Sequence, residues 1–135
     1  MLIKIEHIGI VVKDLEERIR KYTSLLGLKI KEIEEVKVEN VVNRVAFLPI
    51  GETNIELVQT TGDTGLAADF LKERGEGIHH IAFEVEDLDK TFQELRSKGV
   101  EFVWDQIIRG SRGSMVAVIK PEEFNGVYIE LVQRD

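Results

Sequence analysis

The chain repeats itself, and this internal repeat constrains its fold more than any other feature of the sequence. Residues 4–15 read KIEHIGIVVKDL and residues 77–88 read GIHHIAFEVEDL, so the second copy follows at an offset of 73. The segment IELVQ occurs at 55–59 and again at 129–133, at an offset of 74. Five identical consecutive residues at nearly the same offset indicate a tandem duplication of a unit of roughly 55 residues.

Hydrophobic patterning predicts the same elements in both halves. Each half begins with an apolar, β-branched run typical of a strand and continues with apolar residues at helical spacing. Three further strand-like runs then follow in each half. We expect strands at 5–12, 28–38, 43–50, 54–59, 78–85, 100–108, 114–120 and 127–133. The fold class is therefore predicted to be α+β, with tandem βαβββ units forming a curved, partly open mixed sheet with its helices outside.

The helix boundaries carry their own signals. Asp14 and Asp87 immediately precede the two helical patterns, and Asp is a favourable N-cap residue. Gly27 and Gly99 stand where each helix is expected to end through a left-handed residue. Both aspartates are accordingly interpreted as structural.

The 135 residues are expected to form a single domain, residues 1–135, because this length suits one domain. It contains two repeats, about 4–59 and 77–133. Residues 60–76 link them and carry a turn cluster followed by a short helix. This linker is too regular in pattern for a flexible tether, so the halves are expected to share one sheet system.

Composition narrows the functional classes. The 18 Lys and Arg against 25 Asp and Glu give a net charge of −7, which disfavours binding to nucleic acid or to an anionic membrane. The chain has no Cys, which excludes disulfides, thiolate metal ligands and a Cys nucleophile. No apolar run approaches the roughly 20 residues of a membrane span, and the N-terminus lacks the pattern of a signal peptide. We expect a cytoplasmic location.

Strand alternation places one His and one Glu of each half on the face away from the helices. His7 and His80 occupy this face of the first strand of each unit, beside the small residues Gly9 and Ala82, which are expected to leave room for a ligand. Two imidazoles and two carboxylates suit a divalent cation such as Co²⁺, Ni²⁺, Mn²⁺, Zn²⁺ or Fe²⁺. The predicted metal ligands are His7, Glu56, His80 and Glu130.

Three other features near these strands have plainer expected roles. His79 alternates to the other face from His80 and is interpreted as structural. The run RGSRGS at 109–114 predicts either a solvated hairpin loop or an anion site made by Gly amides with Arg109 and Arg112. Trp104 and Phe124 are expected to serve packing.

The sequence also resembles a known family. The strands HIGIVVKDL and HHIAFEVEDL, the hairpin LPIGETNIELVQ and the segment RGEGIHHIAFEV are similar to the vicinal oxygen chelate superfamily, and within it to the methylmalonyl-CoA epimerase family. The resemblance covers nearly the whole chain. It matches the four predicted ligands one for one and implies a second catalytic carboxylate, for which Glu39, 17 residues before Glu56, is the nearest match.

This resemblance implies an isomerase that acts on an acyl-CoA thioester. Epimerisation at the carbon next to the thioester requires one base on each face of that carbon, and Glu130 and Glu39 are the predicted pair. A divalent cation would stabilise the enolate formed when the proton leaves. We also expect a homodimer.

Other functions fit the same residues. Lactoylglutathione lyase (glyoxalase I) resembles the chain in fold and ligands but acts on a glutathione hemithioacetal. A dioxygenase would use His7, His80 and Glu130 to hold Fe(II), although Glu56 would then occupy a position that oxygen and substrate need. A metal-free small-molecule binding module would have no use for the four side chains.

Overall fold

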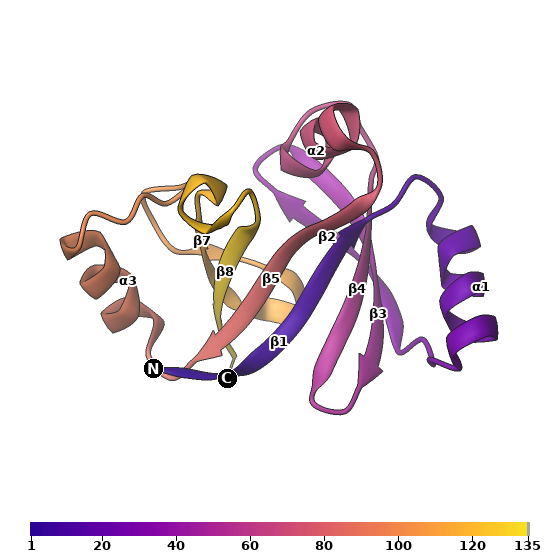
Figure 1. Cartoon of the computed structure of the whole chain (residues 1–135), viewed down its shortest axis with the longest axis horizontal. Coiled ribbons are helices and arrows are strands. Elements are labelled where there is room, and N and C mark those ends of the chain that lie inside the picture. The colour runs from indigo at the N-terminus through magenta and orange to yellow at the C-terminus, as the bar shows by residue number, and fades with distance from the viewer. Residues whose placement is uncertain (135) are drawn as a thin grey trace.

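The fold is a single eight-stranded sheet to which each repeat contributes four strands (Figure 1). The structure is a computed structural model and describes residues 1–134. The first repeat contains β1 (Leu2–Val11), α1 (Leu15–Leu26), β2 (Glu32–Val38), β3 (Val41–Ile50) and β4 (Thr53–Thr60). The second contains β5 (Gly77–Val85), α3 (Leu88–Ser97), β6 (Ile108–Arg109), β7 (Met115–Ile119) and β8 (Tyr128–Gln133). Between them lies α2 (Leu66–Arg74).

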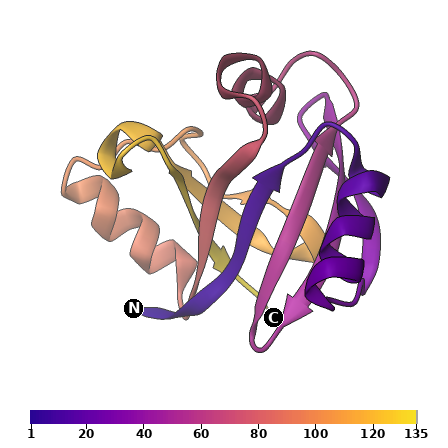
Figure 2. The same cartoon turned by 45° about the vertical axis from the view of Figure 1, so that its right-hand side comes forward.

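The two repeats join through their first strands. The sheet has the order β2-β3-β4-β1-β5-β8-β7-β6, with β1 and β5 antiparallel at its centre. The pairs β1 with β4 and β5 with β8 are parallel, and the other pairs are antiparallel. The predicted α+β fold with a curved mixed sheet is confirmed. Figure 2 shows β1 and β5 running side by side between the two halves.

The sheet curls until its two ends meet. The backbone N–H of Arg112, between β6 and β7, donates to the Glu34 carboxylate on β2 at 3.2 Å. Trp104 of the second repeat likewise donates to Glu39, just beyond the end of β2. These contacts join segments far apart in the sheet order, so the concave face becomes the wall of an almost closed space.

Helices α1 and α3 cover the convex face, as predicted, whereas the first turn of α2 lines the cavity on the other face (Figure 1). Helix α1 packs Leu15 and Ile19 against strands β3 and β4, and α3 packs Leu88 and Phe92 against β7 and β8. The residues that alternate with His7, namely Ile10 on β1 and Val12 just beyond its end, belong to the α1 core. Helices α1 and α3 thus leave the opposite face of the sheet for the site.

Repeated polar residues fix the start of each helix. Asp14 accepts a hydrogen bond from Glu17 N, and Asp87 accepts one from Lys90 N, both at 3.1 Å. The predicted N-caps are therefore confirmed. The duplicated IELVQ segment adds a second cap, because its Gln side chain accepts the first helical N–H. Gln59 Oε1 accepts from Leu15 N and Gln133 Oε1 from Leu88 N, both at 2.7 Å.

The strand predicted over 100–108 is wrong for most of its length. Within this segment, Phe102 forms an isolated bridge with Ile119 of β7. The chain pairs with β7 again only at the two residues of β6. After Val103, whose N–H still bonds Val118 O at 2.8 Å, the chain leaves the sheet. It does so where the Trp104 indole reaches across to Glu39 of the first repeat, a contact that strand pairing cannot anticipate.

Among residues 1–134, no helix combines the length and the apolar character needed to cross a membrane.

Candidate metal centre and active site

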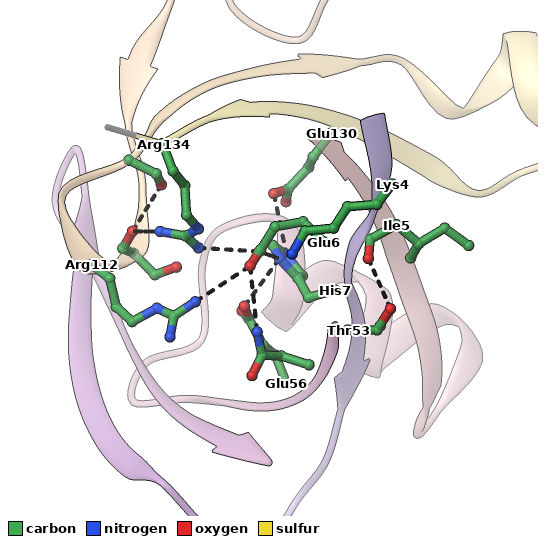
Figure 3. Close-up of polar contacts among 12 residues, drawn as sticks. Lys4, Ile5, Glu6, His7, Thr53, Glu56, Arg112, Glu130 and Arg134 are labelled. Atoms are coloured by element: carbon green, nitrogen blue, oxygen red, sulfur yellow. Dashed lines mark hydrogen bonds and ion pairs between the residues drawn. The ribbon is translucent and has the colours of Figure 1, made fainter. Parts of the chain in front are cut away.

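The four predicted ligands meet on the concave face, and Figure 3 shows three of them, His7, Glu56 and Glu130. They come from four neighbouring central strands, in the order β4, β1, β5 and β8. His7 Nε2 lies 3.1 Å from His80 Nε2, and the Glu130 carboxylate lies 3.6 Å from the first nitrogen and 3.4 Å from the second. Ligand atoms of His7, Glu56 and His80 all lie within 4.8 Å of one another. The pseudo-symmetric arrangement expected from the repeat is thus present in space.

The donor set fits a divalent cation. Glu56 is buried, and burial raises its pKa to about 7, because a carboxylate loses hydration in this position. Its Oε2 atom lies 3.0 Å from His7 Nδ1 yet accepts no hydrogen bond from residues 1–134. A buried carboxylate oxygen without a hydrogen-bond donor, beside two imidazoles and a second carboxylate, is a favourable environment for a metal ion.

The same carboxylates perturb His7. Burial alone would lower its pKa, but the charges of Glu56 and Glu130 and a hydrogen bond with Glu6 outweigh burial and raise the pKa to about 10. Burial lowers the pKa of His80 to about 4. The carboxylates around His7 therefore favour positive charge beside it, which a bound cation would also satisfy.

Glu6 belongs to the site although the sequence analysis did not select it. It lies in a β-bulge, since β1 and β5 pair Ile5 with Phe83 and next His7 with Ala82. The bulge turns Glu6 inward, where its Oε1 lies 2.5 Å from His7 Nδ1. Strict alternation from His7 would instead turn Glu6 toward the helix face.

Two arginines of the second repeat neutralise Glu6. Arg134 Nη2 donates to Oε1 at 3.1 Å and Arg112 Nη2 to Oε2 at 3.3 Å (Figure 3). Burial would raise the pKa of Glu6, but hydrogen bonds from His7 and Arg134 lower it to about 2. Glu6 is thus an ionised carboxylate buried behind His7.

The RGSRGS segment is not a fully solvated loop, and Arg112, one of the two arginines of the expected anion site, pairs with a carboxylate of the protein, whereas Arg109 is exposed at the cavity. The segment forms a 3₁₀ turn at Ser111–Gly113 that is partly buried. The Arg112 guanidinium points inward to Glu6 and lies 4.8 Å from the centre of the Phe47 ring. The Glu6 carboxylate thus pairs with Arg112 in place of an external anion.

His79 does not lie on the face of β5 that alternation predicted. His79 lies in a second β-bulge, opposite the step from Gly9 to Ile10 in β1. Its Nδ1 lies 2.9 Å from Nδ1 of His80, and its ring lines the same cavity as the predicted ligands. The two histidines therefore contact each other, although alternation had predicted opposite faces.

Gly9 leaves room for a protein group and not for a ligand. A Cβ atom built on Gly9 would overlap the imidazole ring of His80. Ala82, its counterpart in the second repeat, is fully buried against Val116, Val118 and Val132. The small residues beside the histidines thus allow β1 and β5 to bring the two rings together.

Glu39 lies at the rim of the site. It follows β2 in a left-handed conformation, with φ of 56°, and is exposed. Its Oε1 accepts a 2.6 Å hydrogen bond from the Trp104 indole. Trp104 is thus a polar partner of Glu39 as well as a packing residue. Phe124, expected to pack, is 43% exposed in a 3₁₀ turn.

A cavity of about 340 Å³ opens in front of these groups. All four predicted ligands line it, together with Glu39 and Trp104. Much of its remaining wall is apolar and consists of valines, namely Val36, Val38, Val41, Val45, Val58, Val103, Val116 and Val118. A few polar groups converging in a mostly apolar cavity are typical of a small-molecule site.

The fold and site define a glyoxalase-like protein. The sequence profile of the Glyoxalase/Bleomycin resistance protein/Dioxygenase superfamily matches residues 6–118, and the chain belongs to this superfamily. Epimerases are prominent among its relatives, which confirms the resemblance found in the sequence. The chain is 32% identical to an ethylmalonyl-CoA/methylmalonyl-CoA epimerase of Cereibacter sphaeroides, over 98% of this chain and 99% of that protein.

Human mitochondrial methylmalonyl-CoA epimerase is 30% identical, with 96% of this chain and 73% of the human protein covered. Among solved structures, a variant of Streptomyces coelicolor methylmalonyl-CoA epimerase in complex with 2-nitronate-propionyl-CoA superposes with a TM-score of 0.91 at 33% identity. The match covers 98% of each chain.

The lyase alternative has a more distant relative. Lactoylglutathione lyase of Arabidopsis thaliana is 30% identical over 95% of this chain, but the match covers only 43% of the lyase. The comparisons therefore favour an isomerase of the epimerase type.

Proposed function

We propose that this protein epimerises methylmalonyl-CoA and depends on a divalent metal ion to do so. The observation that carries the proposal is the convergence of His7, Glu56, His80 and Glu130 in a cavity that Glu39 also lines. Relatives and solved structures named as methylmalonyl-CoA epimerases support the substrate class. The substrate would be an acyl-CoA thioester.

The chain's own carboxylates would move the proton. Epimerisation removes the hydrogen of the carbon between the thioester and the free carboxylate and returns a proton to the opposite face. One base is therefore needed on each side of that carbon. Glu130, in the centre of the site, would serve one face, and Glu39, at the rim, the other.

His7, Glu56, His80 and Glu130 would hold the metal. When bound, a divalent cation supplies Lewis-acid stabilisation of the negative charge that develops on the thioester oxygen. The valine-rich wall would exclude water around the reacting carbon and so strengthen this electrostatic stabilisation. Glu6, already paired with two arginines, would remain ionised and leave proton transfer to Glu130 and Glu39.

The test follows solvent exchange with each substrate epimer separately. The purified protein, freed of metal and then loaded with Co²⁺, Mn²⁺ or Zn²⁺, is mixed with (2R)- or (2S)-methylmalonyl-CoA in deuterated water. We expect deuterium at the substrate carbon, the appearance of the other epimer, and loss of both after chelation. Exchange that persists unchanged without metal would contradict the metal-dependent part of the proposal.

A parallel arm uses methylglyoxal with glutathione. Conversion of that hemithioacetal, with no exchange in methylmalonyl-CoA, would establish the lyase in place of the epimerase. The homodimer and the cytoplasmic location stay predictions from the sequence, and light scattering during size-exclusion chromatography measures the first.

A further inference from the structure

Each of the two central strands contains a β-bulge immediately before its predicted metal ligand. In β1 the extra residue is Glu6, before His7, and in β5 it is His79, before His80. The two bulge residues are equivalent in the repeat, at the same offset of 73 that relates the two ligands. Without the bulges, alternation would turn both residues away from the histidines that follow them.

The bulge in β1 places a carboxylate on the outer nitrogen of His7. Glu6 Oε1 lies 2.5 Å from His7 Nδ1, closer than Glu56 Oε2 at 3.0 Å, while His7 Nε2 faces His80 and Glu130. An ionised carboxylate only accepts hydrogen bonds, so Nδ1 carries the proton. Salt bridges from Arg112 and Arg134 hold Glu6 in this position. The lone pair of a neutral His7 is then on Nε2, toward the centre.

The bulge in β5 places an imidazole on the outer nitrogen of His80. Nδ1 of His79 and Nδ1 of His80 lie 2.9 Å apart, so one nitrogen donates and the other accepts. The His79 ring is fixed by stacking on Tyr128, with centroids 4.7 Å apart, and by an edge contact with Phe70 at 5.2 Å. His79 is therefore not free to turn away.

The hydrogen bond between the two Nδ1 atoms allows two arrangements, and only one of them leaves His80 able to bind a cation. If His80 Nδ1–H donates, its Nε2 keeps a lone pair toward His7 and Glu130, and the proton of His79 lies on Nε2. That Nε2 atom is buried and has no hydrogen-bond partner among the described residues. If His79 donates instead, Nε2 of His80 carries a proton and cannot bind a cation.

We propose that Glu6 and His79 are positioning residues that hold the Nδ1 atoms of His7 and His80, so that both Nε2 atoms face one metal ion. This inference rests on the metal centre of the proposed function. Partners of this kind fix the ring orientation and tautomer of a histidine ligand, and their loss commonly costs about 10–100-fold in metal affinity. In this protein the partner of His7 is a carboxylate, and the partner of His80 is a neutral imidazole.

The first test replaces His79 by Phe, which keeps an aromatic ring against Tyr128 and Phe70 but removes the acceptor. We expect calorimetric titration of the metal-free protein with Zn²⁺ to show affinity about 10–100-fold weaker, without a lower melting temperature. The control Tyr128→Phe keeps the stack and should bind Zn²⁺ as the native protein does. Native affinity in His79→Phe would overturn the proposal for β5.

The second test reads the tautomer directly and needs neither metal nor substrate. Long-range ¹H–¹⁵N NMR of the metal-free native protein at pH 8 should show His80 protonated on Nδ1 and His79 on Nε2. Nδ1 protonation should no longer dominate for His80 in His79→Phe. A His80 protonated on Nε2 in the native protein would refute the inference, whether or not the protein epimerises any thioester.

The third test concerns Glu6. Glu6→Gln retains an acceptor for His7 Nδ1–H, whereas Glu6→Ala removes it. We therefore expect Zn²⁺ affinity to fall more in Glu6→Ala than in Glu6→Gln. Equal native affinity in all three proteins would overturn the proposal for β1. Arg112 and Arg134 lose their partner in Glu6→Ala, so the folding of this variant is checked by circular dichroism. If Glu6→Ala is unfolded, Glu6→Gln alone decides the outcome. A measurable loss is then still expected, because a neutral amide is the weaker acceptor.

Discussion

The indole Nε1–H of Trp104 donates a 2.6 Å hydrogen bond to Oε1 of Glu39, which links the second repeat to the end of β2 in the first. Trp104 is the only tryptophan of the chain and is partly exposed at the cavity. Its fluorescence therefore reports on the neighbourhood of the predicted second base. We expect an acyl-CoA analogue bound in the cavity to shift its emission to shorter wavelength, because the ligand replaces water around the indole. Unchanged emission at ligand saturation, established by calorimetry, would contradict this placement.

Glu39→Gln tests the second base itself. Loss of one general base typically slows the reaction about 10²–10⁴-fold, so epimerisation should fall by that order while metal affinity stays native. Solvent exchange should persist for one epimer, served by Glu130, and fail for the other. Glu130→Gln should weaken metal binding and slow both directions together. If Glu39→Gln converts both epimers at the native rate, the second base is another group.

Gly9→Ala should disrupt the centre without replacing any predicted ligand. The added methyl group would overlap the His80 ring, and overpacking of this kind costs about 1–3 kcal/mol in the free energy of unfolding. We expect lower stability in urea and weaker Zn²⁺ binding. Gly62→Ala, where nothing lies within 4 Å of the new atom, is the matched control. Native metal affinity in Gly9→Ala would show that the His80 ring can move aside.

Acid should weaken the fold through Glu6. Its pKa is lowered from 4.5 to about 2, so its stabilising contribution is complete above pH 4.5 and is lost as the pH falls toward 2. Urea denaturation at pH 5 and pH 3 should show a smaller loss of stability for Glu6→Gln than for the native protein. Parallel losses in the two proteins would mean that the Glu6 ion pairs with Arg112 and Arg134 contribute nothing to this acid sensitivity.

The repeat made much of the fold predictable, because it reports the same local pattern twice. The helices were predicted from Asp14 and Asp87 together with helical spacing, and the structure shows both caps. The grouping of His7 with His80 and of Glu56 with Glu130 followed from strand alternation and the offsets. Local signals sufficed here, since a strand's faces and a helix's first turn depend on neighbouring residues.

The failures occur where distant contacts override the local pattern. Alternation assigned His79 to the wrong face and gave no reason to select Glu6, because a bulge depends on how β1 and β5 pair and leaves no mark in either strand alone. The segment after Val103 looked like a strand but leaves the sheet where Trp104 reaches Glu39. A pattern within one strand cannot show which partner lies across a curled sheet.

The sequence by itself determined the duplicated βαβββ units, the covered and open faces of the sheet, and the four polar residues on its open face. Only the tertiary structure decided how those residues are held: by Glu6 between two arginines, by His79 against Tyr128, and by Gly9 beneath His80. The physical reason is distance along the chain. Periodicity records which side of an element is buried, whereas the partners of a buried charge come from strands that meet only after the sheet has curled.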